Sequence, residues 1–405
     1  MTTNAVNTTM SQTQNKAPLR RWMQKFLHST DLGMIPVIAA LIAIWVVFEI
    51  LNPHFLTPRN LSNLSAQIVV TGTLALAETF VILLGMIDLS IGWSSVVAAS
   101  VFSVGTVFFN LPVWPCVGLG IGASVLIGFL QGLLVSRVGV PSFVVSLGGA
   151  MIAEGITLAM LTQHGGSVPL SDDLSTAVGT LNVPQGWSWG IALVLFALYA
   201  VVRLKRHADR RRRGAGEAHT IVVAKLAFSL AVMVIGIGLL CAYHGVPILL
   251  VIFLAALFGS AFLTKSMQFG RHLYAVGGNA EAARRSGINV RFIQLAAFTI
   301  AGALVGLGGL LDAARLGVAS ATVGDSDIML NAVAAAVIGG TSLFGGRGSV
   351  YGAFFGALVI ASVTNGMDLI GAPSSVRFGV EGVILLAAIT IDTLLRQRRL
   401  RSGRA

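Results

Sequence analysis

PILLVIFLAALFGSAFLT (residues 247–264) and FIQLAAFTIAGALVGLGGLL (residues 292–311) are two apolar runs, and the polar stretch KSMQFGRHLYAVGGNAEAARRSGINVR (residues 265–291) lies between them. A helix needs about 20 apolar residues to cross the hydrocarbon core of a bilayer. Both runs therefore predict transmembrane helices. The polar stretch predicts a loop that is held at the membrane surface.

The middle of this loop carries the signals of a short helix. Asn279 can cap an N-terminus, Glu281 lies early and two arginines lie late, as the helix dipole favours, and Gly287 can end the helix in a left-handed conformation. Gly277-Gly278 provide a flexible lead-in. About two turns are marginal in isolation, so we expect a partner protein to hold this helix; an ordinary amphipathic loop helix is the alternative. The expected contact residues are Asn279, Glu281, Ala282, Ala283, Arg284, Arg285 and Gly287.

The rest of the chain has the composition of a membrane protein. Hydrophobic residues make up 55% of it and charged residues 11%, which is far from the balance of soluble domains. We therefore predict an all-α, polytopic membrane protein with about 10–12 transmembrane helices. The tenth candidate is short and rich in Ala and Gly, so it either crosses the membrane or re-enters. The candidate segments are residues 34–51, 64–84, 91–109, 115–136, 142–161, 187–203, 221–243, 247–264, 292–311, 327–344, 350–366 and 377–395.

The distribution of basic residues predicts the orientation. An even number of crossings places both termini on one side, and that side receives all of the 27 Lys and Arg residues except Arg59, Arg315 and Arg377. The loop 162–186 on the other side has no Lys or Arg. The positive-inside rule then puts both termini in the cytoplasm. The net charge of +11 is thus a topology signal, and we expect no nucleic-acid partner.

The membrane domain is expected to span residues 34–395. Before it, residues 1–33 are polar and predict a disordered cytoplasmic tail. Residues 204–220 predict a basic cytoplasmic loop that serves orientation and can contact anionic membrane lipid. Residues 396–405 predict a basic cytoplasmic tail. The N-terminal part lacks a short apolar core with a small-residue cleavage site, so the first apolar run is expected to be an anchor.

The sequence shows no catalytic motif. It contains no HExxH, no GxSxG and no paired His or Cys with metal-ligand spacing, so no metal site is expected. GSAFLTKS (residues 259–266) resembles a phosphate loop, but Thr264 replaces the second glycine and the segment ends an apolar run. GLGG (residues 306–309) fits close helix packing better than dinucleotide binding. Uphill transport would therefore need a nucleotide that is hydrolysed on another chain, and no cofactor is expected here.

Two Gly-rich breaks fit one pattern, G-x3-L-x2-G-x2-S-V. The first is GMIDLSIGWSSV (residues 85–96), and the second is GGTSLFGGRGSV (residues 339–350). Irregular backbone at membrane depth survives only where protein or a cavity satisfies it, and transporters place substrate near such breaks. A duplicated half and a chance match both remain open.

Ionisable groups inside apolar segments are further candidates for residues that line a transport path, because such groups usually face a water-filled path or the bundle interior. Glu78 and Glu154 lie deep in their segments. Each could line a transport path or form a hydrogen bond between helices, and the sequence favours neither role over the other. Glu49 and Glu381 lie toward segment ends, where they can reach headgroup water, and they receive little weight.

Four blocks carry a family resemblance: IDLSIG (87–92), VPSFVVSLGG (140–149), LYAVGGNAEAARRSGINV (273–290) and VIGGTSLFGGRGSVYGA (337–353). They resemble the permease subunits of bacterial sugar ABC importers of the ribose/xylose/galactose branch. The likeness extends over nearly the whole chain in the expected order, and the third block is highly specific.

Two further features resemble the xylose-type permease in particular. One is an additional region at residues 187–245, which holds two apolar segments with a basic loop between them; the other is NGMDLIGAP (365–373). The Gly85-Met86 pair before Ile87 departs from the usual residues of the first block but leaves its centre intact.

The resemblance implies a homodimer in the bacterial inner membrane that moves a monosaccharide, such as xylose or a similar pentose, into the cytoplasm. A separate ABC ATPase subunit would bind ATP and Mg, and a periplasmic sugar-binding protein would deliver the sugar. Residues 279–287 would form the coupling helix that docks in the ATPase.

Sugar is neutral, so we expect its path to be lined by hydroxyl and amide groups more than by charges, and we expect no tight sugar site. An ion-coupled secondary transporter of small polar solutes is the alternative; an intramembrane enzyme is a third and remote one. The path candidates are Asp88, Ser90, Asn331, Thr341, Ser342 and Asn365.

Overall fold

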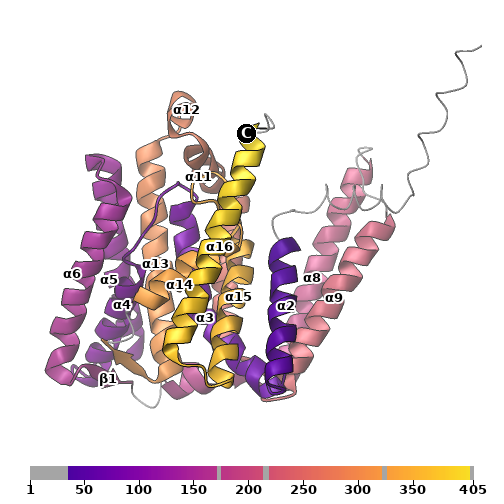
Figure 1. Ribbon diagram of the computed structural model, residues 1–405, viewed down its shortest axis with the longest axis horizontal. Helices are drawn as coiled ribbons and strands as arrows, with labels where there is room; N and C mark the ends of the chain where they lie inside the picture. Colours follow the sequence, from indigo (N-terminus) through magenta and orange to yellow (C-terminus); the bar gives the residue numbers. More distant parts are fainter. Residues whose placement is uncertain (1–34, 171–174, 213–218, 322–325, 402–405) are drawn as a thin grey trace, which may run out of the picture.

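The computed structural model describes residues 35–170, 175–212, 219–321 and 326–401, which form a bundle of helices (Figure 1). Each of the twelve apolar segments predicted from the sequence overlaps one of these helices, so the all-α fold is confirmed. The predicted tail 1–33 lies outside the described residues. The α-helices are α2 (Ile35–Leu51), α3 (Pro58–Ile82), α4 (Ile91–Val107), α5 (Val113–Leu133), α6 (Ser142–Leu161), α8 (Gln185–Arg212), α9 (His219–Cys241), α10 (Ile248–Lys265), α11 (Gln268–Gly278), α12 (Ala280–Arg285), α13 (Val290–Leu316), α14 (Ser326–Ile338), α15 (Val350–Leu369) and α16 (Ser374–Arg401).

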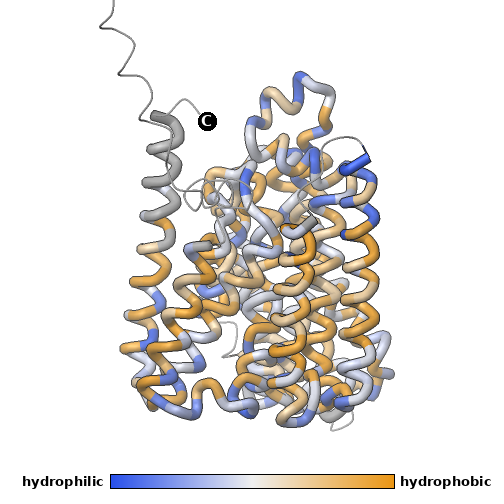
Figure 2. The backbone as a smooth tube through the Cα atoms, turned by 90° about the vertical axis from the view of Figure 1, so that its right-hand side faces the viewer, coloured by the Kyte–Doolittle hydropathy of each residue, from blue (hydrophilic) through white to orange (hydrophobic). Residues whose placement is uncertain are grey.

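The helices have the lengths and composition of membrane spans. Among the described residues, eight helices are long and apolar enough to cross a bilayer, and α2, α4 and α14 are shorter apolar helices. Figure 2 shows hydrophobic residues along the bodies of the helices, with hydrophilic residues mostly at their ends and in the loops. The backbone groups of a helix bond within the helix, which is why apolar runs in lipid adopt this form.

The tenth segment is short, as its sequence indicated. Helix α14 has 13 residues, which corresponds to a length of about 20 Å at 1.5 Å per residue. The hydrocarbon core of a bilayer is about 30 Å thick. Helix α14 alone is therefore too short to span it, and the Gly-rich break at residues 339–349 follows directly.

Two boundaries differ from the predicted ones. Helix α8 continues through Arg212, so much of the predicted loop 204–220 is helical, and α16 continues through Arg401 into the predicted tail 396–405. Arg and Lys are good helix formers and are favoured near a helix C-terminus. The basic runs therefore extend these helices beyond their apolar parts.

Helix α3 is the centre of the bundle. It is buried along most of its length and packs against α13, α14, α15 and α10. Helix α13 also packs closely on α5, because α13 presents glycines to it: a Cβ on Gly302 would lie 2.5 Å from the Ser124 carbonyl oxygen, and one on Gly306 would lie 2.9 Å from the Ile121 Cα. The predicted packing role of the GLGG cluster is confirmed.

Two short antiparallel sheets tie loops together. Strand β1 (Ser167–Pro169) pairs with β4 (Val318–Ser320), and β2 (Asn182–Val183) pairs with β3 (Val246–Pro247). Strand β1 lies at the end of the bundle opposite α12 (Figure 1). Helices α8 and α9, which form the additional region, stand as a pair at one edge of the bundle, and α9 contacts α3.

Candidate functional site

Helix α12 projects from one end of the bundle (Figure 1). Asn279 caps it, because its side-chain oxygen accepts a hydrogen bond from the Ala282 amide at 2.9 Å. Gly287 follows the helix with a left-handed φ of +83°. The cap and the left-handed glycine are therefore placed as the sequence predicted.

One face of α12 is held and the other is open. Ala283 is buried in the main apolar core together with Leu83, Val290 and Ile293. Glu281 forms ion pairs at 3.3 Å with Arg285 and at 3.7 Å with Arg284, and all three side chains are more than half exposed. Exposed ion pairs add little stability. This face therefore carries fixed charges that a partner could bind.

Backbone contacts fix α12 to the bundle through the end of α11. Gly277 lies against the Leu83 carbonyl, which follows α3, and a Cβ on Gly277 would overlap that oxygen and lie 2.7 Å from the Gly346 amide nitrogen. The flexible lead-in expected at Gly277-Gly278 is therefore wrong: both glycines are the last residues of α11. A glycine is needed at 277 because backbones meet there.

The two Gly-rich breaks meet at the same place. The Gly346 amide donates a hydrogen bond to the Leu83 carbonyl at 2.9 Å, and a Cβ on Gly85 would lie 3.2 Å from the Phe344 carbonyl oxygen. The Tyr274 hydroxyl donates to the Gly348 carbonyl at 3.0 Å, and burial raises the pKa of this hydroxyl. We call this contact of Leu83, Gly277 and Gly346 the glycine junction.

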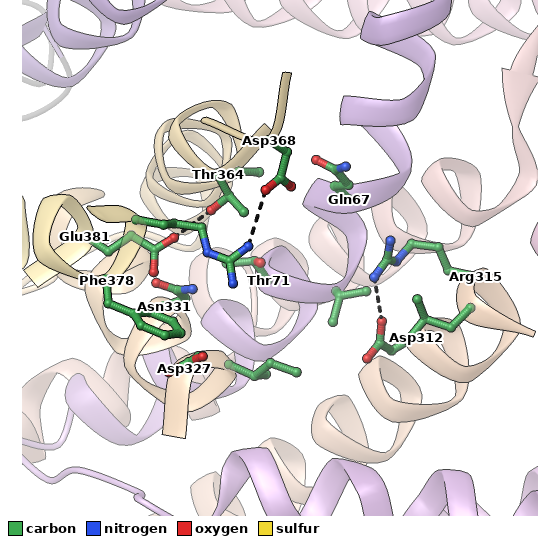
Figure 3. Close-up of a pocket in the computed structure, with 15 residues that line it drawn as sticks. Gln67, Thr71, Asp312, Arg315, Asp327, Asn331, Thr364, Asp368, Phe378 and Glu381 are labelled. Atoms are coloured by element: carbon green, nitrogen blue, oxygen red, sulfur yellow. Dashed lines mark hydrogen bonds and ion pairs between the residues drawn. The ribbon is translucent and has the colours of Figure 1, made fainter. Parts of the chain in front are cut away.

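A cavity of ≈ 370 Å³ lies near the opposite end of the bundle. It is bounded by the middle of α3, the last turns of α13 and α15, and the first turns of α14 and α16 (Figure 3). Residues 322–325, which precede α14, are outside the described chain. The polar lining residues are Gln67, Thr71, Asp312, Arg315, Asp327, Asn331, Thr364, Asp368, Arg377 and Glu381.

Hydrogen bonds and ion pairs order this lining. Arg315 pairs with Asp312 at 3.2 Å within α13, and Arg377 of α16 pairs with Asp368 of α15 at 3.3 Å. The Thr364 hydroxyl donates to Glu381 at 2.8 Å. Figure 3 shows the Asp312–Arg315 pair at one side of this space and Glu381 with Asn331 at the other. The cavity can therefore offer both donors and acceptors to a polar solute.

The predicted path residues lie in different places. Asn331 lines the cavity. Asn365 instead accepts a hydrogen bond from Asn60 at 2.8 Å, which ties α15 to α3. Asp88 accepts from the Ser90 hydroxyl, and Ser90 accepts from Gln131 at 2.8 Å, inside the helix packing near the first break.

The remaining two candidates, Thr341 and Ser342, belong to the second break. Thr341 is buried there, and the Ser342 amide bonds to the Arg347 carbonyl at 2.9 Å. Of the six candidates, the cavity therefore brings in Asn331 alone.

Most of the cavity lining was not singled out from the sequence. Glu381 received little weight as a group near headgroup water, yet it is buried and bonds Thr364. A signal was present: Arg315 and Arg377 are two of the three basic residues that fall on the otherwise basic-poor side. Their carboxylate partners explain why they are tolerated there. Within the described residues, no group of three His, Cys, Asp or Glu could hold a metal ion.

A family model described as the permease component of a branched-chain amino acid transport system matches residues 60–389. The chain belongs to this permease family. XylH of Escherichia coli (strain K12), a xylose transport system permease protein, is 36% identical to the permease over 341 residues, which cover 83% of this chain and 86% of the relative.

More distant relatives carry other sugars in their names. The ribose import permease protein RbsC of Haemophilus influenzae is 28% identical over 79% of this chain and 81% of its own length. The fructose import permease protein FrcC of Rhizobium meliloti is 27% identical over 84% and 78%. No solved structure matches the permease significantly. Together with the apolar helices, these relatives identify it as a sugar-importer permease and a multi-pass protein of the inner membrane.

Proposed function

We propose that this permease forms the membrane path of an ATP-driven importer for xylose or a similar pentose, and that a separate ATPase subunit drives it through α12. The observation that carries the proposal is the attachment of α12 to two long helices. Its exposed Glu281, Arg284 and Arg285 offer a charged docking face, while Ala283 and the glycine junction fix its other side.

Two rigid connections can pass a displacement of α12 to the cavity. Through the glycine junction, α12 and α11 push on the end of α3, which carries Gln67 and Thr71 in the cavity wall. Through α13, the motion reaches Arg315, which lies about 38 Å from Val290 at 1.5 Å per residue. Packed helices move as units, so a small shift at one end changes the packing at the other.

The remaining parts of the importer follow from the same proposal. The permease works as a homodimer, with both termini and α12 in the cytoplasm, and the membrane domain covers residues 34–395. ATP and Mg bind to the ATPase subunit. A periplasmic sugar-binding protein supplies the sugar at the cavity end. The names of the xylose, ribose and fructose permeases support a sugar as the transported solute.

Charge reversal on α12 tests the docking. With the reconstituted permease, its ATPase and its binding protein, Arg284→Glu should weaken ATPase binding about tenfold or more, since a lost charged contact at an interface costs about 1.4 kcal/mol or more. Lys205→Glu on the peripheral helix α8 is the control, because Lys205 is exposed and basic but distant in sequence from α12.

Two results would reject the proposal. One is ATPase binding and ATP-driven uptake that Arg284→Glu and Glu281→Ala leave at the level of the control. The other is uptake that collapses with an uncoupler while ATP is maintained, which would favour an ion-coupled transporter.

A further inference from the structure

Among the eight long apolar helices of the described chain, α8 and α9 are the least buried. Only 6% of the residues in the apolar stretch of each helix are buried, whereas 78% of those in α3 are. The two helices stand as a pair at one edge of the bundle (Figure 1). Protein therefore covers little of either helix, and bilayer lipid surrounds the pair on most sides.

The basic end of α8 lies at the level of the lipid headgroups. Trp187 is 70% exposed and marks the opposite membrane surface, where tryptophan is enriched. At 1.5 Å per residue, Arg203 lies about 24 Å from Trp187 along the helix, and Arg212 lies about 38 Å from it. The hydrocarbon core is about 30 Å thick, and the whole bilayer is about 40–45 Å thick. Arg203 and Lys205 therefore reach the headgroups by extending outward, whereas Arg211 and Arg212 lie among them.

Helix α9 brings a further base to the same level. The Gln185 side chain donates to the Cys241 carbonyl at 2.7 Å, so the start of α8 and the end of α9 meet. Lys225 lies about 24 Å from Cys241 along α9, which places it at the level of Arg203. The sequence of α9 contains no acidic residue. Two neighbouring helices thus present positive charge at one depth of the membrane.

The bases of α8 surround the helix instead of forming one face. Residues 203–212 hold six Lys and Arg and one acidic residue, Asp209. Successive residues turn by roughly 100° about a helix axis, so Arg203, Lys205 and Arg211 lie on three different sides. Lys205 and Arg211 are exposed. A protein partner would contact one face of the helix, whereas lipid headgroups surround it, so this arrangement favours lipid.

We propose that the basic end of the α8–α9 pair binds the phosphate groups of anionic phospholipids. Clusters of about four to eight Lys and Arg directly beside a membrane helix attract such lipids, and arginine binds phosphate through two parallel hydrogen bonds. The other end of the pair is tied to the bundle, because the Ser188 hydroxyl donates to the Val183 carbonyl at 2.9 Å and accepts from the Val246 amide at 3.4 Å. Bound lipid holds the basic end, and this role is separate from the docking of an ATPase at α12.

Native mass spectrometry of the intact permease tests the proposal by titration with phosphatidylglycerol, which is anionic, or phosphatidylcholine, which is zwitterionic. Arg211→Gln/Arg212→Gln removes two exposed bases from α8. It should weaken phosphatidylglycerol binding at least fivefold, since each base near an anionic surface accounts for about a fivefold change in affinity. Binding of phosphatidylcholine should not change.

The matched control is Arg284→Gln/Arg285→Gln, which removes two adjacent exposed bases from α12 at the projecting end of the bundle (Figure 1). It should leave phosphatidylglycerol binding at the wild-type level. Equal phosphatidylglycerol binding by the two double variants would overturn the proposal. So would an Arg211→Gln/Arg212→Gln permease that keeps its lipid but loses its ATPase, because the basic run would then be a protein-docking surface.

Salt provides a second test on the unmutated permease, which covers the case in which the α8 variant does not fold. In phosphatidylcholine vesicles, electron paramagnetic resonance of spin-labelled phosphatidylglycerol measures how strongly the permease prefers this lipid. The preference should fall when the salt concentration rises from about 0.1 M to about 1 M, because the Debye length shortens from about 10 Å to about 3 Å. A preference that salt leaves unchanged, or no preference at low salt, would refute binding through these charges.

Discussion

Replacing Gly277 by alanine should break the connection between α12 and α3, while the same change at the adjacent Gly278 should not. A Cβ at Gly277 would overlap the Leu83 carbonyl oxygen and lie 2.7 Å from the Gly346 amide nitrogen, whereas a Cβ at Gly278 meets nothing within 4 Å. The two variants have the same chemistry and neighbouring positions. They differ in whether the added methyl enters the glycine junction.

The size of the effect follows from these contacts. To restore a separation of about 3.5 Å from the Leu83 carbonyl oxygen, the backbones must part by roughly 2 Å. That displacement breaks the 2.9 Å hydrogen bond from Gly346 to Leu83, worth about 0.5–1.5 kcal/mol, and adds an overpacking cost of about 1–3 kcal/mol. Alanine returns up to about 1 kcal/mol of helix propensity. The net cost is therefore about 1–3 kcal/mol, and it destabilises the glycine junction.

The assay measures sugar moved per ATP hydrolysed by the reconstituted importer. Gly277→Ala should lower this ratio about fivefold or more, since 1 kcal/mol corresponds to about a fivefold change in an equilibrium. Gly278→Ala should keep the ratio and should leave the thermal unfolding temperature unchanged or slightly raised. The reasoning is refuted if both variants transport with wild-type coupling, or if both lose it to the same extent.

Three further outcomes are expected. Asn279→Ala removes the cap of α12 and should cost about 1 kcal/mol of local stability, seen as faster amide hydrogen exchange at Ala282; unchanged exchange would contradict the cap. Arg315→Gln leaves the buried Asp312 carboxylate without its 3.2 Å partner and should lower the free energy of unfolding by about 2 kcal/mol, after allowance for the partial exposure of the arginine, which is measured as a lower unfolding temperature in detergent; an unchanged temperature would count against that pair. Gly302→Ala should destabilise the α13–α5 contact by about 1–3 kcal/mol, whereas Gly118→Ala on α5, which meets nothing within 4 Å, should not; equal stability of the two variants would argue against close packing.

The membrane fold was predictable because lipid leaves the backbone few choices. An apolar run of sufficient length must satisfy its own hydrogen bonds, and a helix does so within one segment. Helix α12 was predictable for a related reason: the Asn279 cap, its acid and bases and the Gly287 end lie within nine consecutive residues. Both cases depend on local signals.

The glycine junction and the cavity were not predictable in this way. Gly277 and Gly278 are alike in sequence, and only the position of Leu83, far away along the chain, separates a required glycine from a replaceable one. The cavity collects side chains from α3, α13, α14, α15 and α16. Arg315 and Arg377 were visible as exceptions to the charge bias. Only the structure shows that they pair with Asp312 and Asp368, which places both arginines in the cavity wall.

The length of α13 separates two kinds of evolutionary change. Its first turn adjoins α12, and its last turn contributes Asp312 and Arg315 to the cavity. Substitutions so far apart, with no shared neighbours, have nearly additive effects. Substitutions at the cavity end could therefore change which sugar is transported without altering the proposed contact between α12 and the ATPase. Over evolutionary time, one type of ATPase subunit could then serve permeases that transport different sugars.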